Sequence, residues 1–286
     1  MPNLTDISTI QSLCARHNFE LSKGFGQNFI INPSVCPEIV EASQIDETYG
    51  VIEIGPGVGV LTKELAMRAA KVVAIEVDNR LPPILAETLA EFDNVKIVLA
   101  DVLKVDLHAL IAEEFQGLKV AVCANLPYYI TSPIVMKLLQ DNLPIESITV
   151  MVQKEAAERL SAAPGERESG AISYAVSYYA VPEYLFSVSP GSFTPAPKVT
   201  SAVIKLNVRK TPPVQVPDVS AYFAVIRAAF SQRRKTAVNS IASGMRLPKD
   251  VVTAAIVNAG FDARIRPEKL TLADFAAITS QLSAQG

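Results

Sequence analysis

The chain has 286 residues, 49% of them hydrophobic and 19% charged, which is enough for one large domain or for a large and a small one. The net charge of −3 excludes a strongly basic protein, and no apolar run approaches the ~18–20 residues of a membrane span. Three widely spaced cysteines without a C-x-x-C pair, two histidines and a start without a secretory pattern predict a reduced, cytoplasmic protein that binds no metal.

The first two thirds of the chain alternate short apolar runs with helical patterns. Strands that are apolar throughout and separated by helices favour an α/β fold with a parallel sheet covered on both faces. Two further strands, 184–189 and 202–207, follow without a long helix between them, which favours an antiparallel hairpin. The other predicted strands are 50–54, 71–77, 95–99, 118–124 and 147–152, and the predicted helices are 61–70, 82–92, 107–115 and 133–140.

A proline-rich segment at 209–217 predicts a linker between a domain at 1–208 and a small all-helical domain at 218–286. Residues 212–286 carry nine Lys or Arg against five Asp or Glu, whereas residues 1–211 carry 17 against 24. Such an asymmetry can orient a polyanion, and chance scatter of charge is the alternative. The helical patterns of the second domain lie at 220–230, 235–242, 249–259 and 272–282.

The first predicted strand runs into the glycine turn Gly55-Pro56-Gly57-Val58-Gly59 and then into a helix. Glycines let the backbone approach a ligand closely and adopt angles that other residues resist. Val60 stands where the dinucleotide fingerprint G-x-G-x-x-G requires its last glycine, so the turn favours a ligand without phosphates. The negative charge expected on Glu53, just before Gly55 and Gly57, suits an ammonium group.

Two carboxylates follow at the ends of the next strands. Glu76 lies 21 residues after Gly55, where an acidic side chain commonly binds a ribose diol. The third strand leads to Asp101, whose carboxylate can accept a hydrogen bond from an adenine amino group. Because parallel strands bring their carboxyl ends to one edge, the set predicts a site for S-adenosylmethionine, a nucleoside with a cationic sulfonium. Each carboxylate alone could equally be a solvated loop residue or a helix cap.

The segment Asn125-Leu126-Pro127-Tyr128 follows another buried strand and suits a flat ring with an amino group. If the Asn125 side-chain oxygen and the Leu126 carbonyl accept the two amino protons, the nitrogen lone pair turns toward the methyl donor. Pro127 would stiffen the turn, and Tyr128 could stack on the base. The target base must then be unpaired or flipped out. An ordinary turn that packs its tyrosine is the alternative for this segment alone.

Five motifs in the same order resemble the ribosomal RNA adenine N6-dimethyltransferases, from about Leu21 to Leu272. Within that family the chain is most similar to the bacterial enzymes that dimethylate two adjacent adenines in a hairpin near the 3′ end of small-subunit (16S) ribosomal RNA. The motifs are Phe25-Gly26-Gln27-Asn28-Phe29, Glu53-Ile54-Gly55-Pro56-Gly57-Val58-Gly59, Asn125-Leu126-Pro127-Tyr128-Tyr129-Ile130, Phe193-Thr194-Pro195-Ala196-Pro197-Lys198-Val199 and Phe230-Ser231-Gln232-Arg233-Arg234-Lys235-Thr236.

The resemblance implies a Rossmann-like methyltransferase with a mostly parallel seven-stranded sheet and a helical domain that binds ribosomal RNA. It implies that residues 125–128 hold the target adenine and that Phe193 closes over that base from the other side. Arg233, Arg234 and Lys235 would form a basic helix start facing RNA phosphates, where such residues contribute affinity rather than sequence reading. The residues implied to line the S-adenosylmethionine site are Asn28, Ile30, Gly55, Glu76, Asp101 and Asn125.

We therefore expect a monomeric enzyme that methylates the small ribosomal subunit or its precursor particle during ribosome biogenesis. One alternative is a resistance-type enzyme that modifies large-subunit ribosomal RNA. A second is a ribosome-assembly or RNA-binding factor without catalysis, and a third is a small-molecule methyltransferase. The intact glycine turn and the intact 125–128 segment favour catalysis, and the basic end of the chain favours RNA.

Overall fold

The computed structural model divides the chain into two compact units, each described by itself. One unit comprises Met1–Ala157 and Glu183–Val208, and the other Glu158–Pro182 and Arg209–Gly286. The division after Val208 coincides with the boundary expected from the sequence, whereas residues 158–182 fall in the second unit rather than in the first. The structure describes residues 3–20, 28–166, 168–232 and 234–284.

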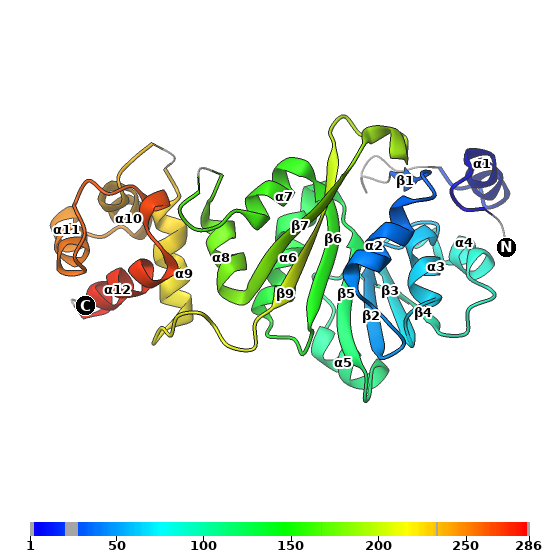
Figure 1. Cartoon of the computed structure of the whole chain (residues 1–286), viewed down its shortest axis with the longest axis horizontal. Coiled ribbons are helices and arrows are strands. Elements are labelled where there is room, and N and C mark those ends of the chain that lie inside the picture. Colours follow the sequence, from blue (N-terminus) through cyan, green and yellow to red (C-terminus); the bar gives the residue numbers. More distant parts are fainter. Residues whose placement is uncertain (1–2, 21–27, 167, 233, 285–286) are drawn as a thin grey trace. The chain divides into compact units, whose positions relative to one another are not determined.

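A seven-stranded sheet forms the centre of the first unit, in the order β4-β3-β2-β5-β6-β9-β7 (Figure 1). Neighbouring strands are parallel from β4 to β6, and β9 is antiparallel to β6. The expected Rossmann-like, mostly parallel sheet is thus confirmed, and its first five strands were predicted to within one residue at each end. The strands are β2 (Tyr49–Ile54), β3 (Lys71–Glu76), β4 (Val95–Leu99), β5 (Lys119–Asn125), β6 (Ser147–Gln153), β7 (Ala180–Val188) and β9 (Ser201–Val208).

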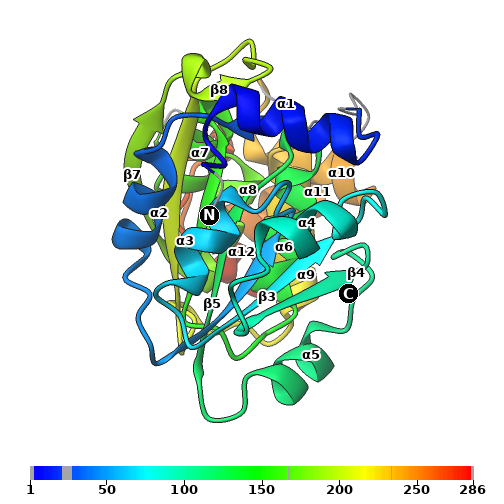
Figure 2. The same ribbon diagram turned by 90° about the vertical axis from the view of Figure 1, so that its right-hand side faces the viewer.

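Helices cover both faces of this sheet, as the apolar strands require. Figures 1 and 2 place α2 and α3 on one face and α6 on the other. On the first face, Ile39 of α2 and Leu65 of α3 pack over Val51 and Val72 in one buried cluster. The helices are α1 (Ile7–Arg16), α2 (Val35–Ser43), α3 (Val60–Ala66), α4 (Pro82–Thr88), α5 (Leu107–Glu114), α6 (Thr131–Gln140) and α7 (Lys154–Ser161).

A second, two-stranded sheet pairs β1 (Phe29–Ile30) with β8 (Phe193–Thr194) in antiparallel register. Sequence patterns did not predict these strands, because each has only two residues and the pairing joins segments more than 160 residues apart. β8 also separates β7 from β9 along the chain, although those two strands are neighbours in the large sheet. The small sheet therefore ties the start of the first unit to its end.

The second unit consists of helices around an aromatic core. Tyr174 is fully buried, with its ring centroid 5.0 Å from that of Phe230 and 5.3 Å from that of Phe275. Its hydroxyl donates to the Leu270 carbonyl, so the buried polar tip is satisfied. The helices are α8 (Ala171–Tyr179), α9 (Val219–Ala229), α10 (Ala237–Met245), α11 (Lys249–Asn258) and α12 (Leu272–Ser283). Sequence patterns predicted the last four of these helices and missed α8.

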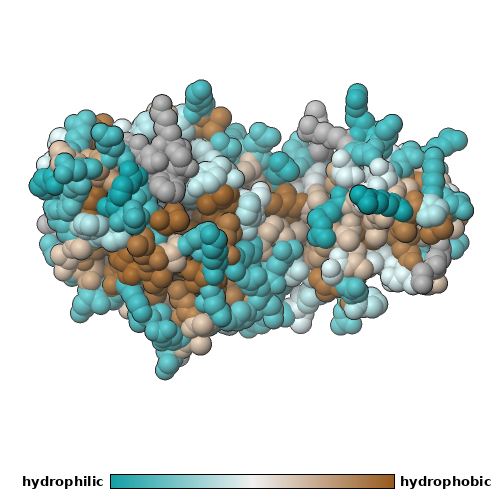
Figure 3. All heavy atoms as spheres, turned by 180° about the vertical axis from the view of Figure 1, so that it is seen from behind, coloured by the Kyte–Doolittle hydropathy of each residue, from teal (hydrophilic) through white to brown (hydrophobic). Residues whose placement is uncertain are grey.

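Among the described residues, no helix is long and apolar enough to cross a membrane. Figure 3 nevertheless shows apolar side chains gathered among hydrophilic ones on one face of the first unit. Large exposed hydrophobic residues of that unit include Val77 (51% exposed), Leu99 (54%) and Leu103 (37%). All three follow or end β3 and β4, beside the carboxylates expected to bind a nucleoside.

Gly50 in β2 leaves room for the buried ring of Phe115. A Cβ at position 50 would sit 2.2 Å from Phe115 Cδ1, so the ring would have to move within a packed core. We expect Gly50→Ala to lower the free energy of unfolding by about 1–3 kcal/mol, the usual cost of overpacking. The measurement is chemical denaturation of both proteins. Gly191→Ala is the control, because nothing lies within 4 Å of its added Cβ, and an equal loss in that variant would contradict the steric explanation.

An ion cluster joins the end of α5 to two strands. Glu114 accepts from Lys71 Nζ at 2.7 Å and from Lys96 Nζ, and these contacts lower the pKa of its carboxyl to about 2. A depressed carboxyl pKa stabilises the fold above the unfolded value of about 4.5, and this contribution disappears as the pH falls toward 2. We therefore expect Glu114→Gln to be less stable than the parent at pH 7. The difference, measured by thermal unfolding, should shrink between pH 4.5 and pH 2, and a constant difference would contradict the charge-based cause.

Candidate functional site

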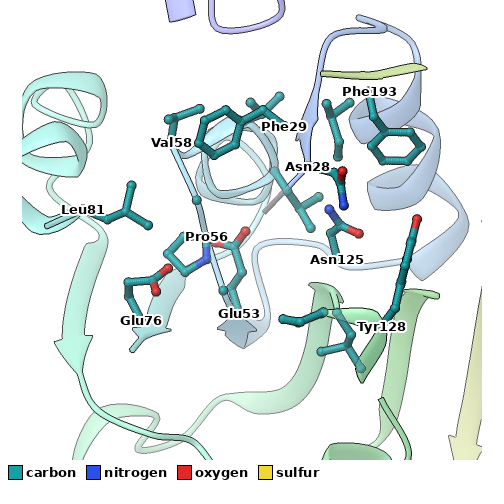
Figure 4. Close-up of a pocket in the computed structure, with 17 residues that line it drawn as sticks. Asn28, Phe29, Glu53, Pro56, Val58, Glu76, Leu81, Asn125, Tyr128 and Phe193 are labelled. Carbon is teal, nitrogen blue, oxygen red and sulfur yellow. The ribbon is translucent and has the colours of Figure 1, made fainter. Parts of the chain in front are cut away.

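A pocket opens at the carboxyl ends of β2, β3 and β5, the edge where sheets of this kind bind ligands (Figure 4). The space between its walls, counted together with adjoining open solvent, is about 780 Å³. Its lining residues all belong to the first unit. They are Asn28, Phe29, Ile30, Glu53, Gly55, Pro56, Gly57, Val58, Val60, Leu61, Glu76, Leu81, Asn125, Leu126, Pro127, Tyr128 and Phe193.

The glycine turn after β2 forms one wall of the pocket. Gly55, Gly57 and Gly59 have φ values of 71°, 59° and 92°, in the left-handed region that side chains resist. Gly59 is also the N-cap residue that directly precedes α3, and its amide donates to the Pro56 carbonyl at 2.9 Å. The turn thus presents bare backbone to the pocket, as the sequence predicted for a closely approaching ligand.

Glu53 lies on the floor of the pocket, below Pro56 in Figure 4. Its side chain is 1% exposed, and Oε2 has no hydrogen-bond partner among the described residues. Burial, with a smaller contribution from the charge of Glu76, raises the pKa of this carboxyl to about 8. In the protein by itself, burial thus favours the protonated form of Glu53 and opposes the negative charge expected from the sequence.

Glu76 ends β3 at the opposite side of the pocket from Asn125 (Figure 4). Its Oε1 accepts from the backbone amides of Val77 at 2.8 Å and Asp78 at 2.7 Å, which fixes the orientation of the carboxylate. Burial raises the pKa of Glu76, and these backbone hydrogen bonds oppose the shift. A fixed carboxylate at a strand end is the geometry that binds a diol through two hydrogen bonds.

Asp101 lies just past β4 and is not among the residues that line the pocket. Its Oδ1 accepts from the Leu103 amide at 3.0 Å, and its Oδ2 lies 3.5 Å from Lys104 Nζ. The strand that carries it is nevertheless next to β3, and the Ala100 amide donates to the Glu76 carbonyl at 2.8 Å. The structure thus places Asp101 near the Glu76 end of the site, while its role in binding stays a prediction.

The 125–128 segment forms the opposite wall, and hydrogen bonds from three neighbouring segments fix it. Asn125 is the last residue of β5, opposite Met151 of β6, and the Leu126 amide donates to the Met151 carbonyl at 3.0 Å. The Pro127 carbonyl accepts from Thr131 Oγ1 at 3.2 Å. The Tyr128 hydroxyl lies 2.7 Å from Ser201 Oγ on β9, and burial raises its pKa. These hydrogen bonds hold residues 125–128 in a fixed conformation at this wall of the pocket.

Phe193 reaches the pocket because β8 pairs with β1, opposite Ile30. The side chain is 3% exposed and lies on the same side of the pocket as Tyr128 in Figure 4. The same view shows the Asn28 and Asn125 side chains pointing toward one another between the aromatic and the acidic ends. The pocket thus has an amide and aromatic end, formed by long-range pairing, and an acidic end, formed by β2 and β3.

None of the described residues that line the pocket is basic. Arg and Lys side chains commonly bind phosphate groups, so a lining without them favours a ligand that is neutral or cationic. Among the described residues there is also no group of three or more His, Cys, Asp or Glu side chains that could hold a metal ion. The lining therefore suits a nucleoside with a positively charged substituent.

Sequence reasoning missed several apolar residues of the pocket. Phe29 and Val58 lie inside motifs that were singled out for their neighbours, so their position in the motif was a usable signal. Leu81 carries no such signal, because it reaches the pocket only through the turn that begins α4. Pro56, Val60 and Leu61 complete this set.

The expected RNA-binding residues lie in the second unit. Arg234 and Lys235 are exposed and directly precede Thr236, which caps the N-terminus of α10 by accepting from the Asn239 amide at 3.4 Å. The basic residues thus lie at a helix start, as expected. Arg233 and the Phe25-Gly26-Gln27 part of the first motif lie outside the described residues.

The comparison with known proteins agrees with this geometry. A family model described as ribosomal RNA adenine dimethylase matches residues 18–283. Proteins named ribosomal RNA small subunit methyltransferase A are similar over essentially their full lengths. The one from Alkaliphilus metalliredigens is 45% identical over 100% of both chains, and the one from Geobacillus thermodenitrificans is 47% identical over 97% of both.

Two solved structures share the fold. A dimethyladenosine transferase from Plasmodium falciparum aligns with a TM-score of 0.74 at 23% identity, over 90% of this chain and 98% of that one. The 23S rRNA methyltransferase ErmE aligns with a TM-score of 0.65 at 26% identity, over 90% and 100%. The family model and the near-full-length relatives establish that the chain belongs to the ribosomal RNA adenine dimethylase family.

Proposed function

We propose that this protein transfers methyl groups from S-adenosylmethionine to N6 of two adjacent adenines in a 3′-terminal hairpin of small-subunit ribosomal RNA. The observation that carries the proposal is the pocket itself, in which Glu76 and Asn125 stand at opposite ends. One end suits a nucleoside donor, and the other suits a flat base with an amino group. The names and the 40–47% identity of the full-length relatives support the small subunit as the target.

The residues at the acidic end fit the donor. When bound, S-adenosylmethionine supplies a methyl group on a cationic sulfonium, which needs no further activation. Glu76 would accept hydrogen bonds from the ribose, and the exposed side chains of Val77 and Leu103 would flank the adenine ring. Asp101 would accept from the adenine amino group. The unpartnered Oε2 of Glu53 leaves an acceptor for the charged amino group of the donor.

The residues at the amide end would position the acceptor. The Asn125 side-chain oxygen and the Leu126 carbonyl would accept the two N6 protons of the adenine, which turns the nitrogen lone pair toward the donor. Tyr128 and Phe193 would hold the base between their rings, because aromatic stacking accepts a flipped-out base. Because the donor is already activated, we expect positioning of the two reactants to supply much of the rate, with no dedicated general base.

The second unit would supply affinity for the ribosomal particle. Arg234 and Lys235, exposed at the start of α10, combine side-chain charge with the positive end of a helix. Phosphate contacts of this kind position RNA without reading its sequence. We propose the small subunit or its precursor particle, in the cytoplasm, as the partner, and a monomer that acts without a metal.

The alternative of a large-subunit target has one observation in its favour, the 26% identity to the 23S rRNA methyltransferase ErmE. The relatives named for the small subunit are almost twice as similar over the full chain, which favours the first proposal. Transfer of labelled methyl groups to small and large subunits from cells that lack this protein separates the two. We expect incorporation into small-subunit RNA only, and incorporation into large-subunit RNA alone would refute the proposal.

Asn125→Ala should lower the rate constant for methyl transfer by on the order of 100-fold, because it removes an acceptor that orients the target amine. Binding of the protein to small subunits should be unchanged, since the basic residues of the second unit remain. Single-turnover methylation and a sedimentation binding assay measure the two effects. A variant that loses binding to the same degree as activity would contradict the assigned role.

The affinity for the donor should depend on pH through Glu53. Because the pKa of the unliganded carboxyl is about 8, a cationic ligand must displace its proton at neutral pH. We therefore expect donor affinity to rise from pH 6 to pH 8 and then to level off. Calorimetry in buffers with different ionisation enthalpies should detect release of a proton on binding at pH 7.

Glu53→Gln is the control for that experiment, because it mimics the protonated side chain. It should abolish the part of the pH dependence that belongs to the protein and leave only that of the ligand. It should also be more stable than the parent above pH 8, since a raised carboxyl pKa costs stability as the pH rises from 4.5 through 8. Equal proton release by parent and variant would rule out Glu53 as its source.

A further inference from the structure

The N-terminal arm, residues 3–20 with α1, packs against one wall of the donor pocket. Ile10 and Phe19 of the arm share a buried cluster with Phe29, Val58 and Leu81, three residues that line the pocket. The rings of Phe19 and Phe29 lie 6.3 Å apart between centroids. The arm therefore supports the pocket wall, although it contributes none of the described lining residues itself.

The side chain of Arg80 fastens this arm to the end of β3. Its guanidinium forms a bidentate contact with Asp78, with Nε 2.8 Å from Oδ1 and Nη2 2.6 Å from Oδ2. The Asp78 side chain is 2% exposed and the Arg80 side chain 42% exposed, so the pair is shielded from solvent only on the carboxylate side. The same guanidinium donates from Nη1 to the Glu20 carbonyl at 3.2 Å and lies 4.9 Å above the ring of Phe19.

These contacts lead from Arg80 back to the glycine turn. Phe19 lies under the guanidinium, and Phe29 packs beside Phe19. The Phe29 ring in turn lies so close to the turn that a Cβ on Gly57 would sit 3.4 Å from its Cε1. This series of contacts begins at Asp78, which binds Arg80 through its side chain. The Asp78 amide donates to Oε1 of Glu76. The series therefore joins both walls of the donor end, the glycine turn and the end of β3.

We propose that Arg80 is a positioning residue for the donor, which holds the N-terminal arm against Phe29 and so fixes the glycine turn relative to Glu76. Arg80 touches neither reactant in this arrangement. The inference rests on the proposed function only in naming the donor. Lysine cannot replace arginine fully here, because it lacks both the planar fork for Asp78 and the flat face over Phe19.

A second set of charged contacts between the same arm and α4 provides a matched control. Arg16 Nη2 and His17 Nε2 both contact the carboxylate of Glu87 in α4, the latter at 2.7 Å. The Glu87 side chain is 40% exposed, and exposed ion pairs contribute little to stability. Glu87→Gln therefore removes charged contacts of the arm without touching the path through Phe19.

The test measures binding of S-adenosylhomocysteine by calorimetry, together with steady-state methylation. We expect Arg80→Met to raise the dissociation constant about tenfold, which corresponds to about 1.4 kcal/mol. Arg80→Lys should fall between that variant and the parent, and Glu87→Gln should stay within about twofold of the parent. The KM for the donor should rise in proportion to the dissociation constant in Arg80→Met, while kcat at saturating donor changes far less.

Because Arg80→Met leaves the buried Asp78 carboxylate without this partner, its stability could fall, so Phe19→Leu tests the same path with the Asp78 contact intact. It should also weaken binding, by a smaller factor. Hydrogen exchange of the α1 amides gives a separate readout. Donor binding should slow exchange in the parent and in Glu87→Gln, and this protection should be lost in Arg80→Met and in Phe19→Leu.

Unchanged donor affinity in both Arg80→Met and Phe19→Leu would overturn the proposal, even if the arm exchanged faster. Faster exchange throughout the first unit, with kcat and affinity falling together, would equally overturn it and reveal a purely structural residue. Failure of the parent protein to bind S-adenosylhomocysteine would instead refute the donor in the proposed function and the inference with it. Binding by the parent with equal binding by the variants refutes the inference alone.

Discussion

The parallel pairing of β2 with β3 and with β5 is the constraint on which the site depends. Parallel strands end at the same edge of a sheet, so Glu53, Glu76 and Asn125 meet there although 72 residues separate the first from the last. The helices on both faces keep the central strands β2, β3, β5 and β6 buried. The pocket is thus a consequence of topology, and its chemistry comes from the residues at which each strand stops.

The two ends of the pocket arise in different ways, which explains how far sequence reasoning could reach. The donor end follows from local patterns, because a strand, a glycine turn and the next strand's terminal Glu76 lie within one short stretch. The parallel sheet was likewise visible as apolar runs separated by helices. Phe193 and Leu81 were harder to predict, because one depends on the two-residue pairing with Ile30 and the other on a turn geometry without a motif. For Phe193 only the family resemblance gave a reason.

Burial and hydrogen bonding also alter the charge or the contacts of residues that sequence patterns singled out. Glu53 was expected to carry a negative charge, but complete burial without a full set of hydrogen bonds favours the protonated form. Asp101 sits at a strand end as expected, yet its carboxylate is engaged with the Leu103 amide and Lys104. Residues 158–182 belong to the second unit. Their helix α8 contributes Tyr174 to the aromatic core of that unit.

Glu53 and Asp78 illustrate opposite ways of burying a carboxyl group beside one ligand site. Asp78 is compensated by the fork of Arg80, so it strengthens the wall that it belongs to. Glu53 keeps an unpartnered oxygen, and this arrangement costs stability unless a proton or a cation neutralises it. In the protein by itself burial favours the protonated form, so under the proposed function a cationic ligand would take the place of that proton. The burial of Glu53 would then favour a cationic ligand over a neutral or anionic one of the same shape, because only the cation compensates the ionised carboxylate.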